Sequence, residues 1–204
     1  MSEPTPIPDV NLDELRDAVR EEYREVAKAP TKGFHFHTGR KLAAICEYRD
    51  EWLDGIPESV VERFAGTGNP FSIAPLQPGE HVVDLGCGAG IDSFIAAKQV
   101  GDTGAVVGVD MTKAMLEQAD RARDAMGLSQ LQFRQGYLED LPVADDWADV
   151  VISNGAANLA PDKLGIYREM HRVLKPGGRL QIADILVDKP VSREAKKKID
   201  LWTG

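Results

Sequence analysis

Asp84-Leu85-Gly86-Cys87-Gly88-Ala89-Gly90 is the stretch of this sequence that decides the fold. It directly follows the apolar run 81–83, and a stretch compatible with a helix begins at Ile91. Glycines at alternate positions let the backbone turn tightly and approach a ligand closely. The N-terminus of the following helix directs free N–H groups to the same place. A strand, a glycine-rich turn and a helix in this order predict a ligand site at the turn.

The spacing of the glycines separates this turn from two other nucleotide-binding loops. A dinucleotide fingerprint G-x-G-x-x-G that starts at Gly86 requires glycine at position 91, where Ile91 stands. A Walker loop requires G-K-[ST], which the sequence lacks. A nucleotide-dependent oxidoreductase is therefore a disfavoured interpretation.

Short apolar runs alternate with helical stretches from residue 80 to residue 184. These runs are nearly continuous, as expected of strands buried on both faces, and they lie at 81–85, 105–110, 131–135, 148–153 and 179–184. Their alternation with helices predicts an α/β fold, a Rossmann-like doubly wound sheet of about five parallel strands. Only twenty residues follow Asp184, so the sheet is expected to be short at its C-terminal side.

The chain is expected to have three parts. Residues 1–79 form an N-terminal arm and a helical lid, 80–184 form the Rossmann-like core, and 185–204 form a loop and a helix capped by Ser192. The lid should contain helices that span Asn11 to about Ala29, about 40–53 and about 58–65. The motif KPGG at 175–178 is interpreted as the turn before the last strand.

The composition is that of a globular, acidic protein. Of its 204 residues 43% are apolar and 28% charged, and the formal net charge is -9. The dense basic run 196–198 beside Arg193 is typical of a solvated helix face, so no nucleic-acid partner is expected. Cys46 and Cys87 are too few for a disulfide framework. The N-terminus does not read as a signal peptide and no run reaches membrane-span length, which predicts a cytoplasmic protein without a membrane partner.

Asp110 is the second residue that indicates a ligand. It ends the run 105–110 and stands 20 residues after Gly90. A carboxylate at the tip of the second strand can accept hydrogen bonds from both ribose hydroxyls of an adenosine. The alternative is a structural role at the start of the helix from Thr112.

These motifs together resemble the class I S-adenosyl-L-methionine (SAM) dependent methyltransferases. The pattern is D-x-G-x-G-x-G, an acid after the second strand, and a helix ending in R-V-L-K-P-G-G-R-L, over about residues 80–184. Within this class the chain resembles the arsenite methyltransferase family, in the segments 62–70, 106–116, 151–163, 167–180 and 201–202.

The resemblance implies a SAM-dependent methyltransferase that releases S-adenosyl-L-homocysteine (SAH). It implies the strand order 3-2-1-4-5 with two further C-terminal strands, and a lid residue, Tyr23, that closes over the cofactor. Asp84 and the loop 86–90 would hold the methionine moiety, and Asp110 and Met111 the ribose and adenine. Leu138 and Glu139 would flank the adenine edge. The implied cofactor-binding residues are Tyr23, Asp84, Gly86, Cys87, Gly88, Gly90, Asp110, Met111, Leu138 and Glu139.

The cysteines that hold arsenic in the resembled family are absent here. Thr67 stands in the family's G-C-G segment and Gly155 in its I-S-N-C segment, and the chain ends at Gly204 before the third cysteine. Because trivalent arsenic prefers thiolate ligands, we expect that arsenite is not the substrate.

Four polar residues are candidates for the substrate side. His35 and His37 flank Phe36 in a loop, and with no third ligand nearby we expect no metal there. Asn154 and Asn158 follow the fourth strand, where ligands of such sheets collect, although they could equally be turn residues. No catalytic base is indicated, because an activated methyl donor mainly requires alignment with the acceptor.

Two functions remain open from the sequence. The first is a methyltransferase that acts on a small molecule. The alternative is a SAM-binding pseudoenzyme or subunit that a partner chain completes, since the fifth strand would be an open edge. A homodimer, a partner chain or the C-terminal helix, with its apolar stripe Val191, Ala195, Ile199 and Trp202, would cover that edge.

Overall fold

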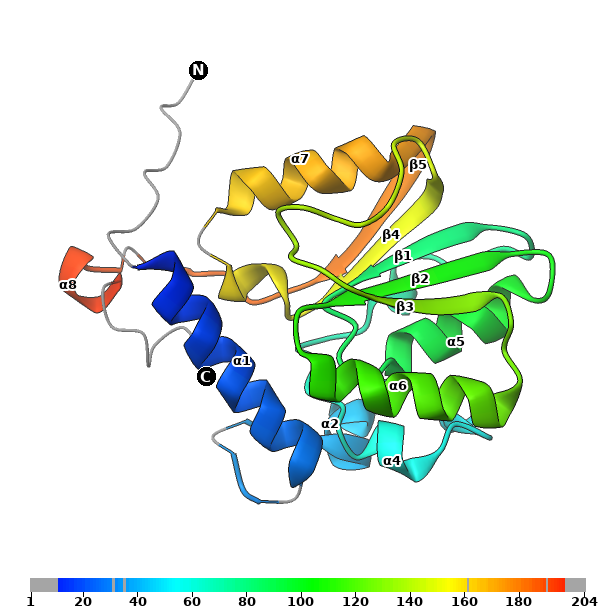
Figure 1. Ribbon diagram of the computed structural model, residues 1–204, viewed down its shortest axis with the longest axis horizontal. Helices are drawn as coiled ribbons and strands as arrows, with labels where there is room; N and C mark the ends of the chain where they lie inside the picture. Colours follow the sequence, from blue (N-terminus) through cyan, green and yellow to red (C-terminus); the bar gives the residue numbers. More distant parts are fainter. Residues whose placement is uncertain (1–10, 31, 35, 161, 190, 197–204) are drawn as a thin grey trace.

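The chain folds into one parallel β-sheet with helices on both faces (Figure 1). The computed structural model describes residues 11–30, 32–34, 36–160, 162–189 and 191–196. The sheet has five strands in the order β3-β2-β1-β4-β5, which confirms the predicted order. All four neighbouring pairs are parallel. The strands are β1 (His81–Leu85), β2 (Ala105–Asp110), β3 (Leu131–Gln135), β4 (Ala148–Asn154) and β5 (Leu174–Ala183).

The helices surround the sheet and precede it. Those of the core are α5 (Ile91–Val100), α6 (Lys113–Met126), the short 3-10 helix η2 (Ala157–Leu159), α7 (Lys163–Val173) and α8 (Arg193–Lys196). Those before the sheet are α1 (Leu12–Lys28), α2 (Gly39–Ile45), α3 (Asp50–Leu53), α4 (Glu58–Val61) and the 3-10 helix η1 (Pro70–Ser72). None of the helices in the described part of the chain is long and apolar enough to span a bilayer.

Alternate residues of the strands fill two separate cores. Val82 of β1 belongs to the core that α5, α6 and the N-terminal helices complete, whereas Val83 belongs to the core beneath α7. Figure 1 shows α5 and α6 on one side of the sheet and α7 on the other. Both faces are buried, which explains why the strands read as continuous apolar runs.

The first helix matches its prediction closely. The Asn11 side chain accepts hydrogen bonds from the N–H groups of Asp13 and Glu14, so it caps α1. The helix ends at Lys28. It packs beside α6, which places the helical N-terminal region next to the carboxyl ends of the strands (Figure 1).

The prediction of one helix over about 40–53 is wrong. Two short helices, α2 and α3, replace it, and the chain turns between them at Glu47, whose φ is 59°. The turn brings Tyr48 inward, where its ring packs against Phe64 and Phe71. Aromatic burial therefore outweighs the preference of this segment for a continuous helix.

The KPGG motif is not a turn before the strand but part of β5. Leu174 already pairs with Ala148, and the register then shifts so that Arg179 pairs with Val150. The shift is a bulge, and Gly177 within it has a φ of 86°, which favours glycine.

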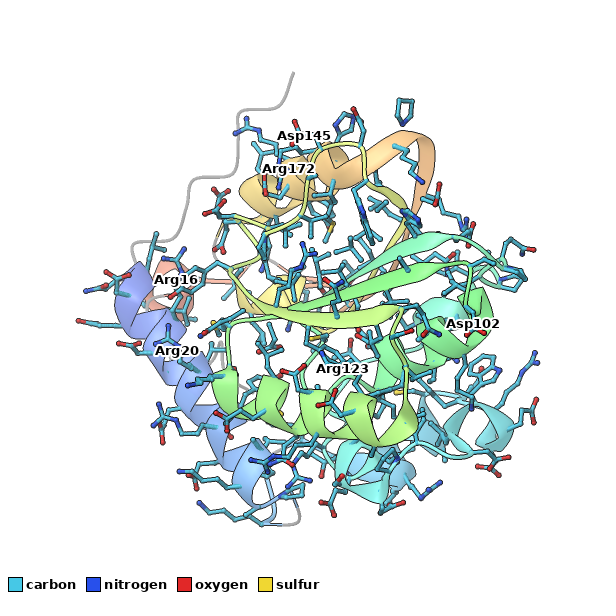
Figure 2. All side chains as sticks on the ribbon, turned by 45° about the vertical axis from the view of Figure 1, so that its right-hand side comes forward. Arg16, Arg20, Asp102, Arg123, Asp145 and Arg172 are labelled. Atoms are coloured by element: carbon cyan, nitrogen blue, oxygen red, sulfur yellow. The ribbon has the colours of Figure 1, made fainter. Side chains whose placement is uncertain are left out.

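The C-terminal helix was predicted as one possible cover for the edge of the sheet at β5. Ser192 Oγ accepts a hydrogen bond from Ala195 N, which confirms the predicted cap. Both Figure 1 and Figure 2 show α8 beside the start of α1, away from β5, so the described part of this helix does not cover the edge. Ile199 and Trp202 lie outside the described residues. Cover by a partner chain or a second copy stays a prediction.

Candidate functional site

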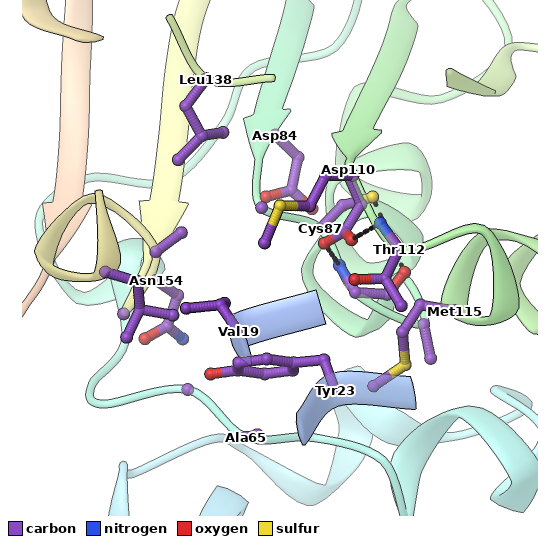
Figure 3. Close-up of a pocket in the computed structure, with 18 of the residues that line it drawn as sticks. Val19, Tyr23, Ala65, Asp84, Cys87, Asp110, Thr112, Met115, Leu138 and Asn154 are labelled. Atoms are coloured by element: carbon purple, nitrogen blue, oxygen red, sulfur yellow. Dashed lines mark hydrogen bonds between the residues drawn. The ribbon is translucent and has the colours of Figure 1, made fainter. Parts of the chain in front are cut away.

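A cavity of about 1070 Å³, part of it open to solvent, lies at the carboxyl ends of β1, β2 and β4. Its walls come from α1, from residues 63–66, from the glycine-rich turn and from the segments after β2, β3 and β4. Figure 3 shows Val19 and Tyr23 of α1 on the side opposite Asp84 and Asp110. All ten residues expected to bind the cofactor line this one cavity.

The turn after β1 requires glycine at several positions. Gly86, Gly88 and Gly90 have φ values of 70°, 53° and 94°, which L side chains rarely adopt. A Cβ on Gly86 would lie 2.3 Å from Ala156 Cβ, whereas one on Gly88 would meet no atom within 4 Å. The turn therefore packs tightly against the segment after β4 and leaves open space at Gly88.

The carboxylate of Asp110 organises the adjacent backbone. It accepts hydrogen bonds from Gly88 N at 2.9 Å and Thr112 N at 2.7 Å, which Figure 3 draws as dashed lines. Burial raises its pKa, and these two hydrogen bonds oppose the rise. Asp110 thus has the structural role considered above, because it accepts a hydrogen bond at the start of the helix from Thr112. Its carboxylate also faces the cavity.

A second carboxyl group, Asp84, lies at the end of β1 and is 2% exposed. It accepts a hydrogen bond from Ser93 Oγ at 2.6 Å. Burial raises its pKa well above the ordinary value, and repulsion from Asp92 and Asp110 adds to the rise. Cys87 beside it is buried, and burial likewise raises the pKa of its thiol, so it is not a reactive thiolate.

A polar network links the glycine-rich turn to the segment after β4. Tyr48 Oη donates to Asp92 Oδ1 at 2.6 Å and accepts from Asn154 Nδ2 at 2.9 Å. Asn154 Nδ2 also donates to Asp92 Oδ2 at 3.2 Å. On its other side Asn154 Oδ1 accepts from Thr67 N at 2.8 Å and Gly68 N at 3.0 Å. Asn154 thus fixes the 66–68 loop next to the cavity.

The two positions that carry cysteine in the resembled family are neighbours in space. A Cβ on Gly155 would lie 2.8 Å from Thr67 Cγ2 and 3.1 Å from Thr67 Oγ1. Gly155 also has a φ of 68°. We call Thr67, Asn154 and Gly155 the acceptor corner. Thr67 and Gly155 replace the arsenic-holding cysteines of the resembled family, and they meet beside the cavity although they are 88 positions apart in the sequence.

Helix α1 is tied to the segment after β3 by polar contacts. Arg16 Nη2 lies 3.4 Å from Glu139 Oε1, and its guanidinium carbon lies 4.8 Å from the centre of the Tyr137 ring. Arg20 Nη2 donates to Tyr137 Oη at 3.1 Å. Figure 2 shows both arginines on α1. Tyr137 thus contacts the lid helix through both arginines.

Two of the three described substrate-side candidates do not line the cavity. His37 is exposed and is not part of the cavity wall, and His35 lies outside the described residues. The buried Asn158 Oδ1 has no hydrogen-bond partner among the described residues, but Asn158 is not part of the cavity wall either. Of the three candidates that the structure describes, only Asn154 lines the cavity.

Several lining residues were not found from the sequence, above all Asp92 and Arg16. An acid two residues after Gly90 looks like an ordinary charge that complements the helix dipole. The signal that could have indicated a role is that the first seven residues of α5 are apolar except Asp92 and Ser93, so the acid stands in a segment expected to be buried. Arg16 could have been predicted only if it had been known which side of α1 faces the core.

The chain is similar to known methyltransferases. The family described as "Methyltransferase domain" matches residues 76–203. The arsenite methyltransferase of Halobacterium salinarum is 44% identical over 139 residues, which cover 68% of this chain and 36% of that protein. The 2-phytyl-1,4-naphtoquinone methyltransferase of Synechococcus elongatus is 39% identical over 110 residues, which cover 53% of this chain and 47% of that protein. The chain spans less than half the length of these two relatives.

A solved structure shows the same arrangement. The arsenic(III) S-adenosylmethionine methyltransferase of Chlamydomonas reinhardtii matches with a TM-score of 0.65 and 42% identity, covering 72% of this chain and 51% of that one. The fold seen here is therefore shared with a protein that is named for the use of SAM.

Proposed function

We propose, because this chain belongs to the methyltransferase domain family, that it is a SAM-dependent methyltransferase that acts on a small molecule. The relatives reported above are named as methyltransferases of arsenite and of a naphthoquinone, both small acceptors. The pseudoenzyme alternative is not favoured, since these relatives carry the names of enzymes. The single observation that carries the proposal is the cavity that joins the glycine-rich turn and Asp110.

The residues of the cavity fit SAM. The open space at Gly88 lets a ligand approach the backbone of the turn, and the N-terminus of α5 follows it. Asp110 keeps acceptor capacity for ribose hydroxyls, since each carboxylate oxygen has more than one lone pair. Apolar Met111, Met115 and Leu138 suit an adenine ring. We assign the methionine moiety to Asp84 and the turn, the adenine edge to Leu138 and Glu139, and the lid to Tyr23.

The residues of this chain would act mainly by alignment and by exclusion of water. SAM, which Asp84, the glycine-rich turn and Asp110 would hold, would supply an activated methyl group on a sulfonium sulfur. Val19 and Tyr23 of α1 shield the cavity from solvent. The acceptor corner holds the other reactant against the turn. We keep as a proposal the division into an N-terminal arm and helical lid (1–79), a SAM-binding core (80–184) and a C-terminal loop and helix (185–204).

Binding of SAM to the purified chain is the first expected result. Isothermal titration calorimetry should give a one-to-one complex, because the described residues form one cavity that joins the turn to Asp110. ATP and NAD serve as controls that share adenosine but lack the methionine moiety, and both should bind much more weakly. Equal affinity for all three would contradict the assignment of the turn to methionine.

Arsenite is expected not to be methylated by this polypeptide. The acceptor corner offers a hydroxyl at Thr67 and no side chain at Gly155, whereas arsenic(III) prefers thiolates. Of the two cysteines, neither Cys46 nor Cys87 is a reactive thiolate, because burial raises both pKa values. The assay contains SAM, a thiol reductant and arsenite, with the Halobacterium salinarum enzyme as positive control. Methylated arsenic formed by this chain would show the expectation to be wrong.

A further inference from the structure

Asp84 and Asp92 are two buried carboxyl groups with only neutral partners. They are 2% and 5% exposed, and both line the cavity. Asp84 accepts from a serine hydroxyl, and Asp92 accepts from a tyrosine hydroxyl and an asparagine amide. Within the described part of the chain, no ion pair includes either carboxyl group. Burial of unpaired charge is costly, so the pair is suited to a positive charge brought by a ligand.

The position of Asp92 identifies which charge this would be. Asp92 lies in the first turn of α5, directly after the glycine-rich turn. It is also hydrogen-bonded to Asn154 of the acceptor corner. In a methyl transfer the sulfonium must lie between the rest of the cofactor and the acceptor. Asp92 stands at that junction, whereas the ribose carboxylate, Asp110, lies at the end of β2.

We propose that Asp92, supported by Asp84, is a specificity-determining residue that makes the cavity prefer the sulfonium of SAM to the thioether of SAH. The proposal rests on the function proposed above. SAM and SAH share adenosine, ribose, amino and carboxylate groups, and differ in one methyl group and one positive charge. Charge interactions are strong in a cavity of low effective dielectric constant. Loss of the methyl group therefore removes the attraction and favours release of the product.

A purely structural role for Asp92 makes a different prediction. Through Tyr48 and Asn154 it could only hold the acceptor corner in place, and then its loss would weaken SAM and SAH binding alike. Tyr48→Phe is the matched control for this role. It removes the hydroxyl that donates to Asp92 but keeps the ring, which packs against Phe64. Because loss of this hydrogen bond raises the pKa of Asp92, the variants are compared at pH 8.5, where the carboxylate stays charged.

The test compares the dissociation constants of SAM and SAH by calorimetry at pH 8.5. The wild-type chain should bind SAM more tightly than SAH. Asp92→Asn should reduce this preference by about tenfold or more, a modest value for a unit charge pair at an effective dielectric constant of about 20. Tyr48→Phe should leave the preference unchanged. If Tyr48→Phe reduces the preference as much as Asp92→Asn does, the electrostatic role is wrong.

The wild-type chain allows the same test without a substitution. Burial raises the pKa of Asp92 to about 6, while the bonds from Tyr48 and Asn154 oppose the rise. As the pH falls from 7.5 to 5 this carboxylate gains a proton, so SAM should bind more weakly and the preference for SAM over SAH should fall. This measurement decides the matter even if Asp92→Asn does not fold.

Other ionisable groups near Asp92 do not produce the same signature. These groups are Asp84 on β1, Asp110 on β2, Cys46 and Tyr48 after α2, and Arg63 in the cavity wall. Asp110 would bind the ribose, which SAM and SAH share, so its effect on the two dissociation constants cancels in their ratio. Burial raises the pKa of Cys46 and of Tyr48, which remain neutral in this range. Asp84 belongs to the proposed pair.

The outcomes separate this inference from the proposed function. If the wild-type chain binds neither SAM nor SAH, the proposed function fails. If it binds both, but with a preference that neither pH nor Asp92→Asn alters, only the role of Asp92 is wrong. A preference that falls in both experiments supports the inference.

Discussion

Replacement of Asp110 by alanine is expected to weaken SAM binding by about 100-fold. Hydrogen bonds to a charged group contribute about 1.5 to 3 kcal/mol each, so two ribose bonds correspond to about 3 kcal/mol. The substitution also removes the acceptor for Gly88 N and Thr112 N, which hold the turn at the cavity. Calorimetry with SAM measures the effect, with circular dichroism to establish that the variant is folded.

Asp102→Ala provides the matched control for this experiment. Asp102 is an exposed carboxylate in the turn after α5, and it does not line the cavity (Figure 2). The control makes the same change in net charge and should leave SAM affinity unaltered. An Asp110→Ala variant that binds SAM like the wild-type chain would remove Asp110 from the site.

Substitution of Gly86 by alanine is expected to destabilise the fold by about 3 kcal/mol. A residue other than glycine at a φ of 70° costs about 1 to 2 kcal/mol. The new Cβ would lie 2.3 Å from Ala156 Cβ, and forced overpacking adds about 1 to 3 kcal/mol. The side chain of Ala156 cannot rotate away, so the backbone itself must move. Urea denaturation measures the free energy of unfolding.

Gly127→Ala isolates the conformational part of that cost. Gly127 ends α6 with a φ of 67°, and a Cβ there would meet no atom within 4 Å. This variant should lose only that conformational part, about 1 to 2 kcal/mol. Equal losses in the two variants would show that the close approach of the turn to Ala156 is not a constraint on the fold.

The sheet could be predicted from the sequence because its signals are local. Val82 and Val83 are adjacent, and each fills a different core, so a buried parallel strand shows itself as a short unbroken apolar run. The glycine-rich turn is equally local, since the left-handed backbone at Gly86 requires glycine at that position.

The parts that were missed depend on contacts between distant segments. The expected helix is interrupted at Glu47, and Tyr48 thereby reaches Asp92 and Asn154, which are 44 and 106 residues away in the sequence. The residues around position 47 do not predict contacts with such distant partners. Asn154 and Asn158 look alike from the sequence, because both follow the fourth strand, yet only Asn154 lines the cavity.

The cavity walls are drawn from residue 15 to residue 160, so they exist together only in the folded chain. A ligand that binds there and not to the unfolded chain shifts the folding equilibrium by mass action. At a concentration of 100 times its dissociation constant it adds about 2.7 kcal/mol to the free energy of unfolding. The thermal transition of the whole domain therefore reports occupancy of the cavity, and candidate acceptors can be ranked by the further rise that each causes in the presence of SAH.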